Sequence, residues 1–123
     1  MNFHRLTTEQ EVLTLLKTLP QTISLDCETN SAKPRHCELL SVVLGTEDSA
    51  YSIPAKFIDL IHSIANKHLI LQYFKFDFKV LKRYGLDLID SKFRDIFLLH
   101  HLIPYRHHFL LHRVTSQPQK SVE

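Results

Sequence analysis

Residues 22–27 read TISLDC, and Glu28 follows them directly. The run begins with two β-branched residues and is mostly apolar up to Asp26, which is typical of a buried strand. Side chains two positions apart share one face of a strand, so Asp26 and Glu28 should point the same way at its end. Two like charges this close repel each other, and a divalent cation between them relieves the repulsion. The stretch therefore predicts a strand that presents a pair of carboxylates; the alternative is that both acids simply reach solvent.

The segments that follow predict a meander of strands. A polar loop is expected over residues 29–36 (TNSAKPRH), a second strand over 39–44 (LLSVVL) and a third over 50–53 (AYSI). Residues 45–48 (GTED) have the composition of a turn. Because the links are short, we expect the three strands to pair antiparallel.

Helices are expected before and after this meander along the chain. Residues 8–11 (TEQE) read as a capping box, and the helix that starts there should end before Pro20. A second helix is predicted over residues 54–66. The short apolar segment 69–72 is predicted to be a strand, parallel to its neighbour because a helix precedes it.

The last part of the chain predicts two more helices. One covers residues 75–84, with Gly85 suited to its C-terminal cap, and the other covers the apolar run 96–103 after Asp95. The resulting order, α-β-β-β-α-β-α-α, predicts an α/β architecture with a mixed sheet.

Composition narrows the class of protein. The chain has 123 residues, of which 44% are hydrophobic and 23% charged, as expected for one globular domain. No apolar run approaches the roughly 20 residues that a membrane helix needs, so no membrane association is expected. The N-terminus lacks the pattern of a signal peptide, and with Cys27 and Cys37 the only cysteines, reduced thiols in the cytoplasm are expected. Residues 1–95 hold twelve Lys and Arg and twelve Asp and Glu, which is not the charge of a strong nucleic-acid binder.

A third acid, Asp77, lies in the aromatic segment 73–78 (YFKFDF), in the first turn of an expected helix. Its neighbours three and four positions on are Val80 and Leu81, so Asp77 should lie on the packed side of that helix. The structural alternative is ordinary, because an acid in a first turn complements the helix dipole.

These motifs resemble the DEDD superfamily of 3′–5′ exonucleases. Residues 25–29 (LDCET) are similar to its first motif, and residues 72–77 (QYFKFD) to its second. The second motif most resembles the version in the proofreading domain of family A, polymerase I-like DNA polymerases and their phage relatives. Residues 95–99 (DIFLL) resemble the Asp-led helix that follows in that branch. The resemblance covers roughly residues 20–103 and implies a ribonuclease H-like fold.

The resemblance also implies a reaction and its residues. The family hydrolyses nucleic acid from the 3′ end of a single strand with two divalent ions, Mg²⁺ or Mn²⁺. The catalytic and metal-binding residues would be Asp26, Glu28 and Asp77, and the substrate-binding residues would be Thr29, Asn30 and Tyr73. DNA is expected over RNA as the substrate, and association with a DNA polymerase is a further expectation.

The sequence departs from the family at two places. Tyr73 stands where relatives usually have an Asn that positions the substrate strand. The fourth acid and its neighbouring Tyr or His are also missing, since the only acid after Asp95 is Glu123. We therefore expect a partial exonuclease-like domain over residues 1–104, incomplete at its C-terminus, an irregular tail over 105–123, and impaired activity. The alternatives are an inactive nucleic-acid-binding or accessory domain of the same fold, and an unrelated α/β interaction module.

Several charged residues are left without an assigned role. Lys75, Lys79 and Lys82 recur on one helix face, and Lys33, Arg35 and His36 lie in the loop after the first motif. Either group could contact a nucleic-acid strand or simply be solvated. Asp95 is expected to cap the helix after it. The histidines His100, His101, His107, His108 and His112 could bind a metal, with exposed histidines as the alternative.

Overall fold

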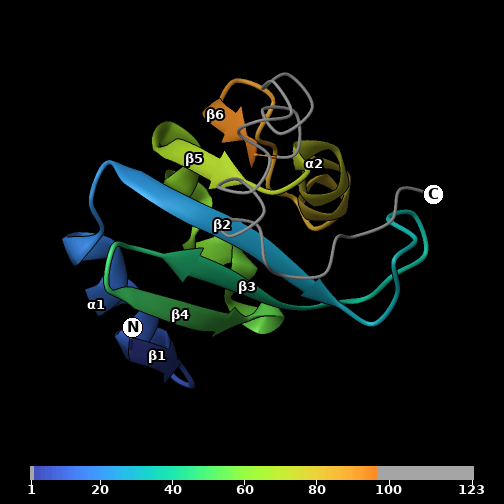
Figure 1. The fold of residues 1–123 in the computed structure, drawn as a ribbon. Coiled ribbons are helices and arrows are strands. Elements are labelled where there is room, and N and C mark those ends of the chain that lie inside the picture. The colour runs from blue at the N-terminus through green and yellow to red at the C-terminus, as the bar shows by residue number, and fades with distance from the viewer. Residues whose placement is uncertain (1, 97–123) are drawn as a thin grey trace.

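The expected meander forms the centre of a six-stranded mixed sheet (Figure 1). The computed structural model describes residues 2–96. The strands are β1 (Asn2–Arg5), β2 (Thr22–Thr29), β3 (Leu39–Gly45), β4 (Ser49–Pro54), β5 (His68–Leu71) and β6 (Lys92–Asp95). Their order across the sheet is β1-β4-β3-β2-β5-β6. The β2–β3 and β3–β4 pairs are antiparallel, as predicted, and the pairs β1–β4, β2–β5 and β5–β6 are parallel.

In strand β2, buried residues alternate with more exposed ones, as expected for a sheet that packs on one face. Ile23, Leu25 and Cys27 are buried, while the residues between them are more exposed. The strand runs two residues further than the sequence predicts, because Glu28 pairs with Ser41 and a bulge carries the pairing on through Thr29. Glu28 therefore lies within the strand, as Asp26 does, rather than directly after its end.

The edge strands β1 and β6 are the elements that the sequence does not predict. All four residues of β1 are exposed, and so are the first three residues of β6. Strands exposed on both faces lack the apolar alternation on which a sequence-based prediction rests. Their place is set by pairing with β4 and β5.

The helices differ from expectation in one region. Helices α1 (Glu9–Thr18) and α2 (Phe74–Arg83) lie where the sequence predicts them, and the capping box of α1 is formed. The helix predicted over residues 54–66 is instead two 3₁₀ helices, η1 (Ala55–Leu60) and η2 (His62–Asn66). The buried residues there are Ile58, Ile61 and Ile64. Their spacing of three matches the 3₁₀ period, so one face of these turns stays against the sheet.

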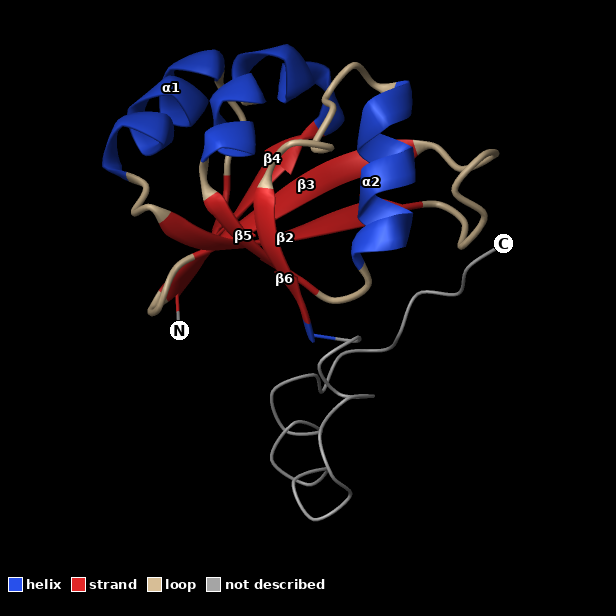
Figure 2. Ribbon diagram, turned by 90° about the horizontal axis from the view of Figure 1, so that it is seen from above, coloured by secondary structure: helices blue, strands red, loops and turns tan. Residues whose placement is uncertain are grey.

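All of these helices lie on one face of the sheet (Figure 2). The core fills the space between the two layers and includes Val12, Val42, Ile53, Val80 and Leu81. No described helix covers the opposite face of the sheet, which we call the open face. The described residues thus form an α/β layer structure with a mixed sheet, as predicted.

Some expectations fall on residues that the structure does not describe. The helix over 96–103, the domain limit at 104, the tail over 105–123 and the clustered histidines lie outside residues 2–96, apart from Ile96 itself. Within the described part of the chain, neither helix is long and apolar enough to cross a membrane.

Candidate functional site

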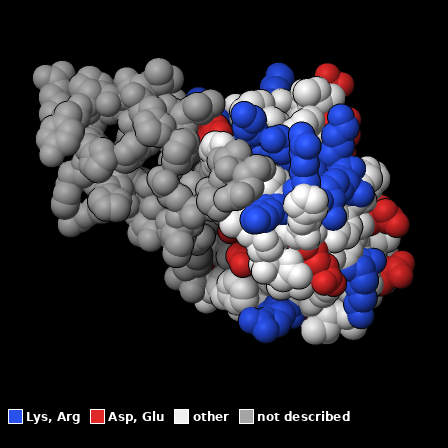
Figure 3. Space-filling view, turned by 90° about the vertical axis from the view of Figure 1, so that its right-hand side faces the viewer, with Lys and Arg blue, Asp and Glu red and all other residues white. Residues whose placement is uncertain are grey.

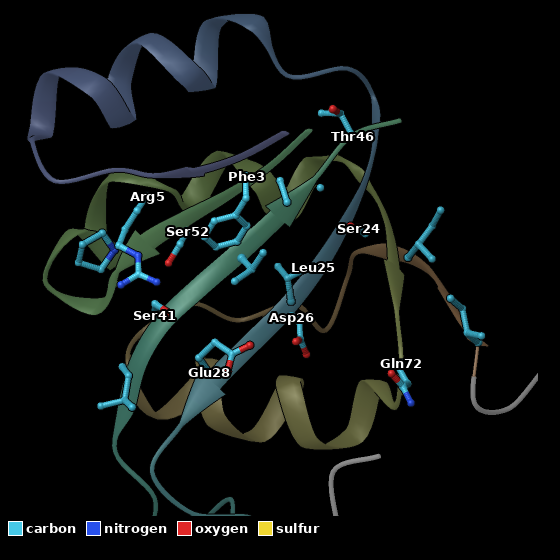
Figure 4. A pocket seen from close by; sticks show the side chains of 17 residues that line it. Phe3, Arg5, Ser24, Leu25, Asp26, Glu28, Ser41, Thr46, Ser52 and Gln72 are labelled. Atoms are coloured by element: carbon cyan, nitrogen blue, oxygen red, sulfur yellow. The ribbon is translucent and has the colours of Figure 1, made fainter. Parts of the chain in front are cut away.

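Asp26 and Glu28 both face the open side of the sheet (Figure 4). They alternate on β2 with the buried residues Leu25 and Cys27, so the pleat turns both carboxylates away from the core. Asp26 is half-buried and Glu28 is exposed. Together they line a cavity of about 820 Å³ that extends over β1, β4, β3 and β2. The predicted carboxylate pair is therefore formed, and it faces a space large enough for a ligand.

Asp77 reaches the same segment of β2 from the other side. It is fully buried in the first turn of α2, and its Oδ1 accepts a hydrogen bond from the backbone N–H of Cys27 at 3.3 Å. Strand β5 pairs with β2 only as far as Ser24, so beyond that point a side chain can take the place of a strand partner. The contact joins Asp77 to the backbone of Cys27, the residue between Asp26 and Glu28.

The chemistry of the three acids suits a hard divalent cation, because Mg²⁺ takes oxygen ligands and binds through one or two carboxylates plus water and phosphate. Asp26 and Glu28 supply such a pair on the open face. Asp77, however, contacts β2 through a backbone group, the N–H of Cys27. Among residues 2–96, no three His, Cys, Asp or Glu side chains are grouped closely enough to hold a metal ion. That Asp26, Glu28 and Asp77 together hold metal ions, as the family resemblance implies, therefore stays a prediction.

Asp95 has two partners that the sequence does not predict, while its expected role as the cap of the following helix falls on residues outside those described and stays a prediction. It is buried at the end of β6, and its two carboxylate oxygens accept hydrogen bonds from the backbone N–H groups of Tyr73, at 2.9 Å, and Phe74, at 2.7 Å. These groups form the N-terminus of α2, so Asp95 binds a helix that precedes it by twenty-one residues in sequence. The carboxylate satisfies free N–H groups and complements the helix dipole. Sequence spacing gives no signal for this pairing, because β6 itself is not predicted.

Tyr73 has a left-handed backbone, with φ 76° and ψ 74°. A bulky residue in this region is uncommon and strained. The hydrogen bond to Asp95 holds this conformation, and the half-buried side chain packs against the core. The strained residue therefore lies at the start of the helix that carries Asp77.

Thr29 and Asn30 shape the loop after β2. Thr29 Oγ1 donates to the carbonyl of Ser31 at 2.7 Å, and Asn30 Oδ1 accepts from the backbone N–H of Glu38 at 2.8 Å. Both side chains thus have partners within the loop. Their role toward a substrate remains a prediction.

The cavity contains polar residues that the sequence analysis does not single out. Arg5 is the one basic residue among the described residues that line it, and Ser41 and Ser52 contribute hydroxyls from neighbouring strands. Gln72 also lines it, and its buried side-chain nitrogen makes no hydrogen bond to any described residue. A sequence gives no signal for Arg5, since its strand, β1, reaches the site only through pairing with β4.

Comparison with known proteins rests on structure. No family model matches the chain, and no curated protein matches it. The solved Nibbler EXO domain of Aedes aegypti is similar with a TM-score of 0.57 and 14% identity, covering 85% of this chain and 58% of that one. NrnC of Brucella melitensis is similar with a TM-score of 0.57 and 17% identity, covering 99% and 64%. A nuclease in its apo form is similar with a TM-score of 0.55 and 21% identity, covering 94% and 60%.

The fold is ribonuclease H-like. At these identities the likeness establishes the fold alone. The chain spans less than two thirds of the length of each of these structures. Further structures of Brucella melitensis NrnC with the same fold contain bound pGG, at 18% identity, and bound Mg²⁺, also at 18% identity.

Proposed function

We propose that the chain is a 3′–5′ exonuclease domain of the DEDD type, with Asp26, Glu28 and Asp77 as its acidic residues. The observation that carries the proposal is the hydrogen bond from the Cys27 N–H to Asp77 Oδ1. It connects two motifs that lie fifty residues apart in sequence, at Cys27, the residue between the two acids of β2. The fold shared with solved nuclease structures supports the same reading.

The proposed cofactor is Mg²⁺ or Mn²⁺, two ions in a complete site. Asp26 and Glu28 would hold the ion on the open face, where a substrate phosphate and water can complete its ligands. A bound ion would supply charge stabilisation at the phosphodiester and activation of a water. That an NrnC structure contains Mg²⁺ supports this choice.

The proposed substrate is the 3′ end of a single strand, with DNA preferred over RNA. Thr29, Asn30 and Tyr73 would lie beside the terminal nucleotide. The polymerase I-like subtype and association with a DNA polymerase are parts of the proposal that rest on the sequence motifs. A reducing compartment such as the cytoplasm is also proposed, because Cys27 and Cys37 are the only two cysteines of the sequence and both are buried.

We expect slow turnover from the 123-residue chain. After Asp95 its only acid is Glu123, so the sequence offers neither the fourth acid nor the neighbouring Tyr or His of the family. The loss of a general base alone typically reduces a rate by ~10²–10⁴-fold. The missing acid is the observation that favours the second candidate, a nucleic-acid-binding domain of the same fold without turnover.

A strand-shortening assay separates the two candidates. The chain is incubated with a 5′-labelled single strand of DNA or RNA in Mg²⁺, Mn²⁺ or EDTA, and the products are resolved by length. An exonuclease gives a metal-dependent ladder that shortens from the 3′ end and is absent with Asp26→Ala. A strand with a blocked 3′ end is the control. Binding without shortening in any metal would favour the second candidate and contradict the first.

A further inference from the structure

The outer face of α2 is basic. Lys75, Lys79 and Lys82 follow one another at helical spacing, on the side opposite the buried residues Asp77 and Leu81. Lys75 and Lys82 are exposed and Lys79 is half-buried. On its own, such a row is an ordinary solvated helix face.

The loop after β2 is fixed against this helix. Arg83 donates two hydrogen bonds through one guanidinium nitrogen, to the carbonyl of Pro34 at 2.9 Å and to that of Cys37 at 2.8 Å. These bonds hold the loop that carries Lys33 and Arg35 beside α2. Two basic segments that are about forty residues apart in sequence thereby form one surface.

We define the basic surface by its six residues, Lys33, Arg35, Lys75, Lys79, Lys82 and Arg83. A hollow of about 360 Å³ lies in it, lined by Pro34, Arg35, Phe78, Lys79, Lys82 and Arg83, none of them acidic. Figure 3 shows Lys and Arg side chains gathered on this side of the molecule.

The charge is concentrated there. The basic surface holds six of the twelve Lys and Arg residues between positions 1 and 95, a segment whose formal charges sum to zero as a whole. Gathering like charges on one surface creates a local positive potential that attracts polyanions. Phe78 adds a half-buried ring in the hollow, with Lys82 Nζ 5.6 Å from its centre. Lysines interleaved with an aromatic ring are typical of surfaces that bind single-stranded nucleic acid.

The basic surface adjoins the acidic site through two shared elements. Helix α2 carries Asp77 in its first turn and the lysines along its length, and the loop leaves β2 directly after Glu28 and Thr29. A strand whose 3′ end lies on the open face, beside Asp26 and Glu28, would reach the lysines on the outer face of α2 by passing around the edge of the sheet, where β2 leads into the loop.

We propose that the basic surface binds the backbone phosphates of a single-stranded nucleic acid several nucleotides from its 3′ end. This inference rests on the proposed function for the placement of that end. The binding itself does not depend on metal or on hydrolysis.

The test measures binding of a 5′-fluorescein-labelled, 12-nucleotide single-stranded DNA by anisotropy, in EDTA, between 50 and 200 mM salt. The triple variant Lys75→Gln, Lys79→Gln, Lys82→Gln should bind roughly 10- to 100-fold more weakly than the unchanged chain. The slope of log affinity against log salt should fall by about 2, because each lost phosphate contact on a single strand contributes about 0.7.

The matched control is Lys17→Gln, Lys56→Gln, Lys92→Gln, which has the same net charge and alters exposed lysines outside the basic surface. Its affinity and slope should stay close to those of the unchanged chain. Equal weakening by both variants, or an unchanged slope in the first, would overturn the inference. Failure of the proposed function looks different: the strand binds with the expected slope but is not shortened in Mg²⁺ or Mn²⁺.

Discussion

Asp77 belongs both to the fold and to the proposed chemistry. Its carboxylate is fully buried and accepts the Cys27 N–H at the point where β5 no longer pairs with β2. The sequence predicts that Asp77 lies on the packed side of its helix, and this is confirmed. It does not predict the partner, because β2 and α2 are fifty residues apart and only the folded sheet brings them together.

Substitution of Asp77 measures how much its carboxylate contributes to the stability of the fold. Asp77→Ala leaves the Cys27 N–H without this acceptor, and we expect a loss of about 1–3 kcal/mol in the free energy of unfolding. Asp77→Asn keeps an acceptor oxygen, so its loss should be smaller, although the negative charge is gone. Urea unfolding of the three proteins measures both effects. Equal stability of the unchanged chain and Asp77→Ala would contradict this role for the hydrogen bond.

At the scale of elements, α2 is positioned by residues outside itself. Asp95 of β6 binds its N-terminus, Gly85 ends it with a φ of 91°, and Tyr84 Oη accepts the backbone N–H of Leu39. The sequence predicts the extent of α2 to within a residue at each end, because its apolar face and its C-terminal glycine are local signals. The anchors come from β3 and β6, so local patterns do not reveal them.

The sequence misjudges two kinds of element, each for its own physical reason. Strands β1 and β6 are exposed along nearly all of their length, so they carry no buried alternation. The 3₁₀ helices are misjudged because an apolar pattern at spacing three also fits one face of an α-helix. Where a local pattern is strong, as in the meander and the capping box, the prediction is confirmed.

Helix α1 should respond to pH through Glu11. The backbone N–H of Thr7, followed by the Thr8 hydroxyl and N–H, donates to this carboxylate and lowers its pKa from the usual 4.5. Because the pKa of Glu11 is lower in the folded state, the stabilisation of the fold by these hydrogen bonds is fully present above the pKa that Glu11 has in the unfolded chain. It is lost as the pH falls through the folded value, in a window that lies below 4.5.

The substitution Glu11→Gln separates the contribution of Glu11 to the pH dependence of stability from that of the other acids. Glu11→Gln keeps the length and a donor–acceptor group but removes the titration, so its stability difference from the unchanged chain should shrink between pH 6 and pH 3. Thermal unfolding across this range measures it, with the exposed Glu9→Gln as the matched control. A difference that stays constant with pH would show that the capping hydrogen bonds do not favour the charged form.

At the scale of the whole molecule, the sheet separates packing from chemistry. The helices and the apolar core occupy one face, and Asp26, Glu28 and Arg5 face the open side (Figures 2 and 4). The sequence predicts the fold class and the pair of acids on β2. It does not predict that Arg5, Ser41 and Ser52 share their cavity, since that arrangement depends on the order of four strands.

Divalent-metal binding tests the proposed site most directly, because it does not require turnover. Titration calorimetry with Mn²⁺ and Mg²⁺ would compare the unchanged chain, Asp26→Ala and the exposed control Asp90→Ala, with circular dichroism to confirm that each is folded. We expect Mn²⁺ to bind more tightly than Mg²⁺. Asp26→Ala should weaken Mn²⁺ binding by about tenfold or more, whereas Asp90→Ala should leave it unchanged. Mn²⁺ binding of equal strength in Asp26→Ala and the unchanged chain would contradict the assignment of the acids to a metal site.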